Sequence, residues 1–314
     1  MPDRTSTLRI VCARGVAFVL GALLASGCSA PPSPSAPARP AAQVDWTAVG
    51  HALGTDLKTE QGGVHTADFP RTDLAITNDN VRLMPGMELG SEAMFTPTSG
   101  TDALLIGEFT VTSQELNPVI SRLQTGGIEI SAVHKHLPNE NPRLWWLHYT
   151  GYGDPVRNAA TLRGALQLTG TPLLLAEPAP PASPPLDTAA LDRIIRHPGA
   201  REDGAYQIHV PLNRPISDTT TGVTLPYLME ASTLLMFQPL DGGKVAINGD
   251  FAMTADQINP VISALHDHSI DIVSLHSHLT HEQPRLFYMH FWSVGDPAAL
   301  AGGLRAALDA AHTD

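Results

Sequence analysis

Six histidines fall into two copies of one pattern, which carries the strongest chemical signal in this sequence. Each copy reads His-x-His, three residues, Glu, then Pro-Arg and finally a third His. The two copies are His134, His136, Glu140, Arg143 and His148, and His276, His278, Glu282, Arg285 and His290. Imidazole nitrogens and carboxylates bind zinc, iron, manganese and copper. The pattern therefore predicts a divalent transition-metal site in each copy, with zinc as the first candidate.

Two interpretations of these histidines stay open. In the first, the three imidazoles of a copy hold a metal or a metal-bound ligand, with Glu140 or Glu282 as a further ligand. In the second, they are hydrogen-bonded core residues that were duplicated with the rest of an ancestral domain. Metal ligation requires neutral imidazole, so under the first interpretation occupancy is expected to fall as the pH drops through about 6.5.

Other charged residues near the pattern are weaker candidates for ligand binding. Glu88 and Glu230 occupy equivalent positions before a Phe-containing strand, where each either completes a site or faces solvent. Arg143 and Arg285 either hold an anionic ligand in a bidentate fashion or pair with the nearby glutamate to fix a turn. The sequence has no Gly-rich phosphate loop, no Gly-x-Ser-x-Gly elbow and no Cys nucleophile, so it identifies no catalytic residue.

The histidine pattern recurs because most of the chain is duplicated. A shift of 142 residues aligns the halves without an insertion, and Asn117-Pro118-Val119-Ile120-Ser121 then falls on Asn259-Pro260-Val261-Ile262-Ser263. Each copy has the length of a domain. We expect repeat 1 at 45–170, a Pro-rich linker at 171–186 and repeat 2 at 187–314.

The elements of a repeat follow from helix caps and apolar spacing. Thr112-x-x-Glu115 has the capping-box form before a helical run, and Asp154-Pro155 is typical of a helix start. Strands are expected at 103–110, 128–136 and 143–149. The order strand, helix, strand, strand, helix predicts an α+β fold: a tandem duplication of a ferredoxin-like (split β-α-β) layered sheet unit with an extra N-terminal helix and strands.

The two strands that carry the histidines are expected to form a hairpin. With its turn centred on Asn141, His134 lies opposite His148, and all three imidazoles share one face. Ile128, Ile130 and Leu144 have the same parity, so the imidazoles are expected to continue an apolar surface.

The N-terminal residues have the form of a bacterial export signal. Three arginines precede an apolar stretch at 15–25, and small residues lead to Cys28. The stretch is too short to span a bilayer, which needs about 20 residues in a helix. We expect a signal peptide at 1–27, lipid attachment at Cys28, a Pro/Ala/Ser-rich tether at 28–44, and a protein anchored to the outer face of the cell membrane.

Net charge limits the partners. Loss of residues 1–27, with three Arg and one Asp, changes the formal net charge from −12 to −14. An acidic chain is repelled by nucleic acid, so none is expected as a partner, and membrane contact is expected only through the lipid. The expected partners are a metal or small ligand.

Several short motifs, each present twice, indicate a family. Gly-Asp/Glu-Phe, Asn-Pro-Val-Ile, His-x-His, Pro-Arg and Gly-Asp-Pro follow a lipoprotein signal. In this combination the chain resembles the LppY/LpqO family of actinobacterial lipoproteins, a domain family of unknown function. The resemblance implies an envelope location and no particular reaction. Three classes remain: a metal- or ligand-binding lipoprotein, a metal-dependent hydrolase or oxygenase, and a structural or partner-binding lipoprotein.

Overall fold

The computed structural model describes residues 43–173 and 184–311, which all fall within one compact unit. The expected signal peptide, Cys28 and nearly all of the expected tether lie outside the described residues, as does the middle of the linker. Within the described ranges, no helix combines the length and the apolar character that crossing a membrane requires.

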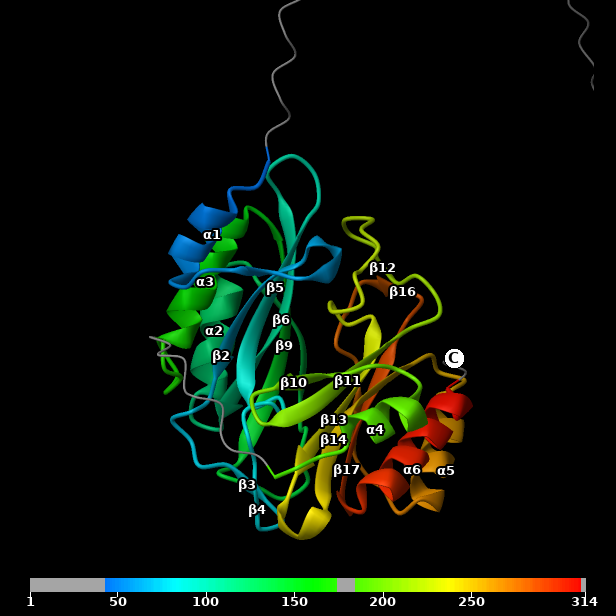
Figure 1. Ribbon diagram of the computed structural model, residues 1–314. Helices are drawn as coiled ribbons and strands as arrows, with labels where there is room; N and C mark the ends of the chain where they lie inside the picture. The colour runs from blue at the N-terminus through cyan, green and yellow to red at the C-terminus, as the bar shows by residue number, and fades with distance from the viewer. Residues whose placement is uncertain (1–42, 174–183, 312–314) are drawn as a thin grey trace, which may run out of the picture. The chain divides into compact units, whose positions relative to one another are not determined.

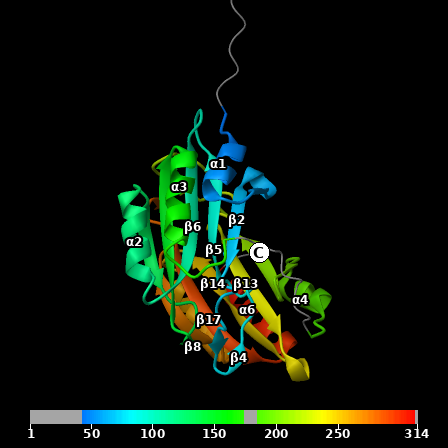
Figure 2. The ribbon, with the colours of Figure 1, turned by 90° about the vertical axis from the view of Figure 1, so that its left-hand side faces the viewer.

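Repeat 1 contains a six-stranded antiparallel sheet with three helices on one face (Figures 1 and 2). The helices are α1 (Trp46–Leu53), α2 (Leu116–Thr125) and α3 (Pro155–Leu166). The sheet has the order β1-β2-β5-β6-β9-β7, formed by β1 (Lys58–Thr59), β2 (His65–Pro70), β5 (Gly90–Pro97), β6 (Ala103–Thr112), β9 (Leu144–Gly153) and β7 (Glu129–His134). A smaller sheet joins β4 (Val81–Arg82), β3 (Thr77–Asn78) and β8 (Glu140–Asn141), and a 3-10 turn covers Gln61–Gly63.

Repeat 2 has the same arrangement. Its helices are α4 (Thr188–Ile195), α5 (Ile258–Asp267) and α6 (Pro297–Ala310). Its six-stranded sheet has the order β10-β11-β13-β14-β17-β15, formed by β10 (Ala200–Glu202), β11 (Ala205–Pro211), β13 (Ser232–Pro239), β14 (Val245–Met253), β17 (Phe287–Gly295) and β15 (Asp271–His276). A two-stranded sheet joins β12 (Ser217–Asp218) and β16 (Glu282–Gln283), and a 3-10 turn covers Asp241–Gly243.

The predicted α+β duplication is confirmed, and its core is a split β-α-β unit. β9 lies between β6 and β7 in the sheet, so the unit β6-α2-β7 is split by the strand that follows it. A ferredoxin-like unit has one more strand after its second helix. Here β5, which precedes β6 in the chain, pairs with the free edge of β6.

The predicted cap at Asp154 forms, whereas the predicted capping box at Thr112 forms only in part, because α2 begins at Leu116 and its N-cap residue, Glu115, makes no side-chain capping hydrogen bond. Thr112 donates its backbone N–H to the Glu115 carboxylate at 2.7 Å, which is half of a capping box. Asp154 accepts hydrogen bonds from the backbone N–H groups of Val156 and Arg157 at the start of α3. The Asp154 contacts satisfy N–H groups that a helix start leaves without an intrahelical partner.

Each main sheet uses its two faces differently. In β6, Leu105, Phe109 and Val111 pack with the helices of repeat 1. The alternate residues Leu104 and Ile106 pack with apolar residues of repeat 2. A second mixed cluster includes Trp146 of repeat 1 and Trp292 of repeat 2. The inner faces of the two sheets therefore pack against each other, and the helices cover the outer faces.

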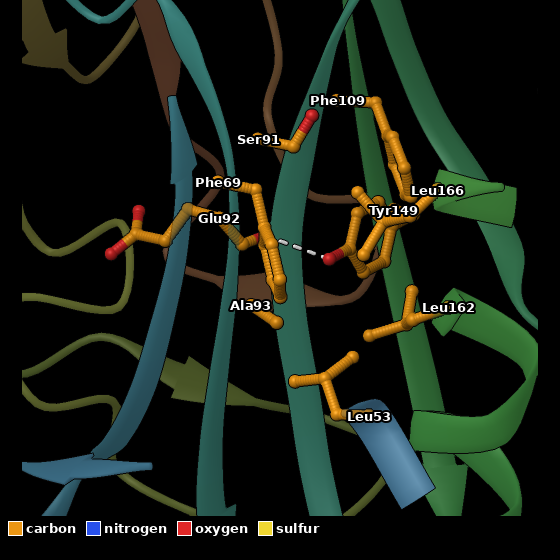
Figure 3. Close-up of a pocket in the computed structure, with 9 residues that line it drawn as sticks. All are labelled: Leu53, Phe69, Ser91, Glu92, Ala93, Phe109, Tyr149, Leu162 and Leu166. Carbon is orange, nitrogen blue, oxygen red and sulfur yellow. Dashed lines mark hydrogen bonds between the residues drawn. The ribbon is translucent and has the colours of Figure 1, made fainter. Parts of the chain in front are cut away.

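Figure 3 shows a hollow within the helix-facing core of repeat 1. Its lining includes Phe69, Phe109 and Leu162, and Tyr149 donates a hydrogen bond to the Glu92 carbonyl at 2.7 Å. No imidazole lines it. It belongs to the packed interior of the repeat and not to the face that carries the histidines.

The predicted hairpin register is wrong by two residues. His134 pairs with Trp146 and Ala132 pairs with His148, so the imidazoles stay on one face because side chains alternate with a period of two. A β-bulge between Ile130 and Ala132 then changes which alternate side chains of β7 face the histidine side of the sheet. Ile130 therefore packs with the helices and does not continue the histidine surface, contrary to the prediction.

Candidate metal centre

The six histidines of the two patterns lie together between the two sheets, where they form what we call the histidine array. It has two rows, one from each repeat: His136, His134 and His148, and His290, His276 and His278. Within a row, neighbouring ring centroids lie 4.9 to 5.1 Å apart. In each row, one histidine ends an edge strand, a second lies two residues later, and the third lies in the neighbouring strand of the sheet.

The rows stack face to face, so every imidazole has a partner from the other repeat. His134 stacks on His276 with ring centroids 3.5 Å apart. His136 stacks on His290 at 3.8 Å, and His148 stacks on His278 at 3.9 Å. The sequence predicted one cluster in each repeat, whereas the structure joins the two clusters because the inner faces of the sheets pack together.

A glutamate lies at each end of the array. Glu88 Oε2 is 3.2 Å from His136 Nδ1, and Glu230 Oε2 is 2.5 Å from His278 Nδ1. Glu230 Oε1 also lies 3.5 Å from Nδ1 of His148, which belongs to the other repeat. The structure therefore places both glutamates at the imidazoles, which was one of the two expectations for them.

Both end glutamates have a left-handed backbone, with φ of 55° at Glu88 and 65° at Glu230. This region is unfavourable for residues other than Gly, Asn and Asp, and such strain often accompanies function. A strained backbone that carries a glutamate in both repeats favours a role for the carboxylate.

Trp146 and Tyr288 each contact both the glutamate and the imidazole at one end of the array. These residues are equivalent in the 142-residue alignment. Trp146 Nε1 donates to the Glu88 carbonyl, and its ring stacks on His136. Tyr288 Oη donates to the Glu230 carbonyl, and its ring stacks on His278. One side chain therefore orients both the glutamate backbone and the imidazole.

Sequence reasoning missed two buried acids beneath the array, Glu108 and Asp250. Glu108 Oε2 lies 3.3 Å from His148 Nε2 and 3.6 Å from His136 Nε2. Asp250 Oδ2 lies 3.6 Å from His278 Nε2. The signal was an acid within an apolar strand, at equivalent positions of both repeats, in the Gly-Asp/Glu-Phe motif.

Most of the array lacks hydrogen-bond partners. Both ring nitrogens of His134, His136, His148 and His290 are buried without a hydrogen bond, and so is Glu88 Oε2. A buried polar atom without a partner costs about 1–3 kcal/mol. Eight such nitrogens in one place do not fit the interpretation of hydrogen-bonded core histidines, but they do fit ligation.

The surroundings keep the imidazoles in the form that binds metals. Burial and neighbouring imidazoles lower the pKa of His134, His136 and His290 well below the usual value. Burial lowers the pKa of His278 to about 4, although the charge of Glu230 opposes the shift. These imidazoles are therefore neutral at pH 7, with a lone pair available for a metal.

The buried acids show the opposite shifts. Burial, with the nearby charge of Glu230, raises the pKa of Glu88 to about 8. Burial and neighbouring carboxylates raise the pKa of Glu108 and Asp250 well above the usual range. Burial would also raise the pKa of Glu230, but contacts with His278 and His148 lower it overall. A bound cation would favour the charged form of all four acids.

Glu140 and Glu282, the acids predicted as additional ligands, have other partners. The Glu140 carboxylate pairs with Lys135 and accepts the backbone N–H of Leu144. Glu282 accepts the backbone N–H of Leu286 and pairs with Arg285. In the described part of the chain, neither acid belongs to a set of mutually close ligand atoms. We therefore remove both from the proposed ligand set.

The two arginines do not contribute to the array. Arg285 pairs with Glu282 at 3.2 Å and donates to the Leu279 carbonyl, which is the turn-fixing alternative. Arg143 is exposed, and Lys135 takes the corresponding pairing in repeat 1. The order of the motif along the chain therefore did not show which acid faces the imidazoles.

Among the described residues, four sets of ligand atoms lie within 4.8 Å of one another, and three of them combine side chains of both repeats. One set is Glu88, His136 and His290, and its counterpart is Glu230, His278 and His148. Further sets are His134 with His136 and His148, and His134 with His276, His278 and His290. The arrangement thus provides two His-His-Glu sets at its ends and a histidine-only region at its centre.

Residues 47–168 and 189–310 both match the family described as Domain of Unknown Function (DUF1259), so the chain belongs to this family. The two matched segments are related by the same 142-residue shift. No curated protein matches the chain.

Two solved structures are similar over much of their length. One is a trimeric bacterial microcompartment shell protein, PduB, at 12% identity, with 81% of this chain and 89% of that chain covered and a TM-score of 0.20. The other is EtuB from Clostridium kluyveri, at 10% identity, with 81% and 89% covered and a TM-score of 0.19. Similarity at this level carries no argument about function.

Proposed function

We propose that this protein binds a divalent transition metal through the histidine array. The observation that carries the proposal is the set of eight buried ring nitrogens without hydrogen bonds. Nitrogen ligands with carboxylates suit zinc first, and also iron, manganese and copper. The acidic surroundings support binding of a cation and oppose binding of an anion.

Elemental analysis of protein purified without a chelator or a metal-binding tag tests this proposal. We expect a transition metal in the purified protein and renewed binding of Zn²⁺ after treatment with a chelator. Because the metal binds the folded state, Zn²⁺ at 100 times its Kd should stabilise folding by about 2.7 kcal/mol. Absence of bound metal, with no thermal shift for zinc, iron, manganese or copper, contradicts the proposal.

A matched pair of variants separates ligation from packing. His136→Ala with His278→Ala removes one imidazole from each end of the array and should abolish the thermal shift with Zn²⁺. His266→Ala with His268→Ala removes two histidines outside the array and should leave the shift unchanged. Equal shifts in both variants would place the metal elsewhere.

We further propose that the protein is a lipoprotein of the cell envelope, as in the LppY/LpqO family. The Ala25-Ser26-Gly27-Cys28 sequence supports lipid attachment at Cys28. Cys28→Ala should release the protein from the membrane fraction or leave an unprocessed precursor. Unchanged labelling by a lipid precursor in this variant would refute the anchoring.

A metal-dependent enzyme is the second candidate function. The observation that favours it is the position of Glu108, a buried acid within 3.6 Å of two array imidazoles. An acid beside a metal with an open coordination position can act as a general acid or base. Zinc-dependent hydrolysis of ester or phosphoester substrates, lost in Glu108→Gln with metal content retained, would establish this function.

A further inference from the structure

We propose that the array holds two metal ions, one at each end, and that each ion is bound by residues of both repeats. One site consists of Glu88, His136 and His290, and the other of Glu230, His278 and His148. This inference rests on the proposed function and adds the number of ions and the repeat from which each ligand comes.

The stacking brings imidazoles of the two repeats together at each end of the array. At each end, an imidazole that follows the edge strand of one repeat stacks on an imidazole from a central strand of the other, at 3.8 Å and 3.9 Å. Glu230 lies within 3.5 Å of both His278 and His148, and so contacts both repeats. A carboxylate and two imidazoles therefore meet at an end only when both repeats are present.

The central pair lies between the two ends. His134 and His276 stack on each other between the end pairs, with centroids 3.5 Å apart. The distance between His134 and each of its row neighbours is 4.9 Å. One ion at one end cannot contact both Glu88 and Glu230, so two carboxylates at opposite ends favour two ions.

The buried acids near the array support a cation at each end. Four carboxyl groups, Glu88, Glu108, Glu230 and Asp250, lie beside the imidazoles, and no Lys or Arg pairs with them among the described residues. A cation at either end would therefore meet carboxyl oxygens that no basic side chain occupies.

Each site has three protein ligands, two imidazoles and one carboxylate. Zinc sites with three protein ligands keep the fourth tetrahedral position for water or an exogenous ligand, and iron sites of the two-His-one-carboxylate type keep several positions. The ligand class expected at each ion is therefore a small neutral oxygen donor, such as water.

Double variants distinguish sites shared between repeats from sites within one repeat. Glu88→Gln with His290→Ala changes both repeats but only one proposed site. Glu88→Gln with His148→Ala changes repeat 1 alone but both proposed sites. Zn²⁺ per chain is measured on the full-length protein after removal of excess metal, with folding followed by thermal denaturation.

We expect two Zn²⁺ per wild-type chain, one in the Glu88→Gln and His290→Ala variant, and none in the Glu88→Gln and His148→Ala variant. If each site lay within a single repeat, the variant with His290→Ala would bind no Zn²⁺ and the variant with His148→Ala would bind one. One Zn²⁺ in the wild type overturns the two-ion inference but not metal binding, whereas absence of zinc, iron, manganese and copper binding overturns the proposed function itself. If an alanine variant fails to fold, Gln at the same position preserves the side-chain volume and gives the same contrast.

Discussion

Repeat 1 and repeat 2 surround the array with equivalent positions but not with identical side chains. The six histidines and the end glutamates are the same in both repeats. By contrast, Trp146 is replaced by Tyr288, and Glu108 by Asp250, with similar contacts in each case. Residues that would touch a metal are retained, whereas residues that support them vary in type and keep the role. The difference indicates that the ligand set, more than the packing around it, is the shared property of the repeats.

Variants of Trp146 and Tyr288 provide the strongest test of this comparison. Tyr288→Phe removes the hydrogen bond to the Glu230 carbonyl but keeps the ring on His278. Loss of such a supporting contact costs about 10- to 100-fold in metal affinity, which calorimetric titration with Zn²⁺ measures. Trp146→Phe should have a similar effect at the Glu88 end.

Tyr149→Phe is the matched control for Tyr288→Phe. It removes an equivalent hydroxyl that donates to the Glu92 carbonyl, on the helix-facing side of the sheet (Figure 3). Its Zn²⁺ affinity should equal that of the wild type. Equal losses in both tyrosine variants would show that hydroxyl removal acts through general destabilisation of the fold.

Glu140 and Glu282, the two acids near the turns, test whether a metal ligand was left out of the histidine array. Glu140→Gln breaks the buried pair with Lys135, and Glu282→Gln weakens the pairing with Arg285. Each variant should lower the free energy of unfolding, by about 2 kcal/mol for Glu140, where the hydrogen bonds involve a charged group. The loss at Glu282 should be smaller because the Arg285 side chain is 46% exposed.

Urea denaturation and elemental analysis on the same samples give both readouts. The Zn²⁺ content should stay at the wild-type value in both Glu140→Gln and Glu282→Gln. A loss of metal in either one would return that glutamate to the ligand set.

Replacement of each end glutamate by glycine should change the free energy of unfolding by different amounts. Glu88→Gly relieves a left-handed conformation that costs about 1–2 kcal/mol for residues other than Gly, and it removes a buried carboxyl with an unpaired oxygen. In the presence of a chelator it should raise the free energy of unfolding by about 1 kcal/mol. Glu230→Gly relieves the same strain but removes a hydrogen-bond partner of His278, so its gain should be smaller. Urea denaturation that ranks the two variants the other way would contradict the assigned contacts.

The smallest expected effect comes from a histidine that only repeat 2 contains. His209 is equivalent to Ala67, and burial lowers its pKa to about 4. Below pH 6.5 the unfolded chain therefore binds a proton that the folded chain does not, and stability decreases as the pH falls towards 4. In metal-free protein, His209→Ala should reduce the slope of the unfolding free energy against pH by an amount equivalent to up to about one bound proton. An unchanged slope from urea denaturation between pH 4 and 6.5 would contradict this origin.

Local sequence determined much of what the structure contains. The capping residues and apolar periodicity were sufficient for the helices after Thr112 and Asp154, because helix starts depend on groups within a few residues. The 142-residue shift revealed the duplication. Strand parity placed His134 and His148 on one face despite a register error, since a slip of two residues leaves the face unchanged.

Tertiary structure alone decided which groups meet. The bulge after Ile130 changes parity through strand pairing, which residue spacing does not show. Glu88 and Glu230 lie 48 or more residues from their imidazole partners, whereas Glu140 and Glu282 lie close in sequence to the histidines and pair with other groups. The union of the two histidine rows depends on packing between sheets. Spacing along a chain determines local geometry, but contacts between distant segments depend on which apolar faces bury each other.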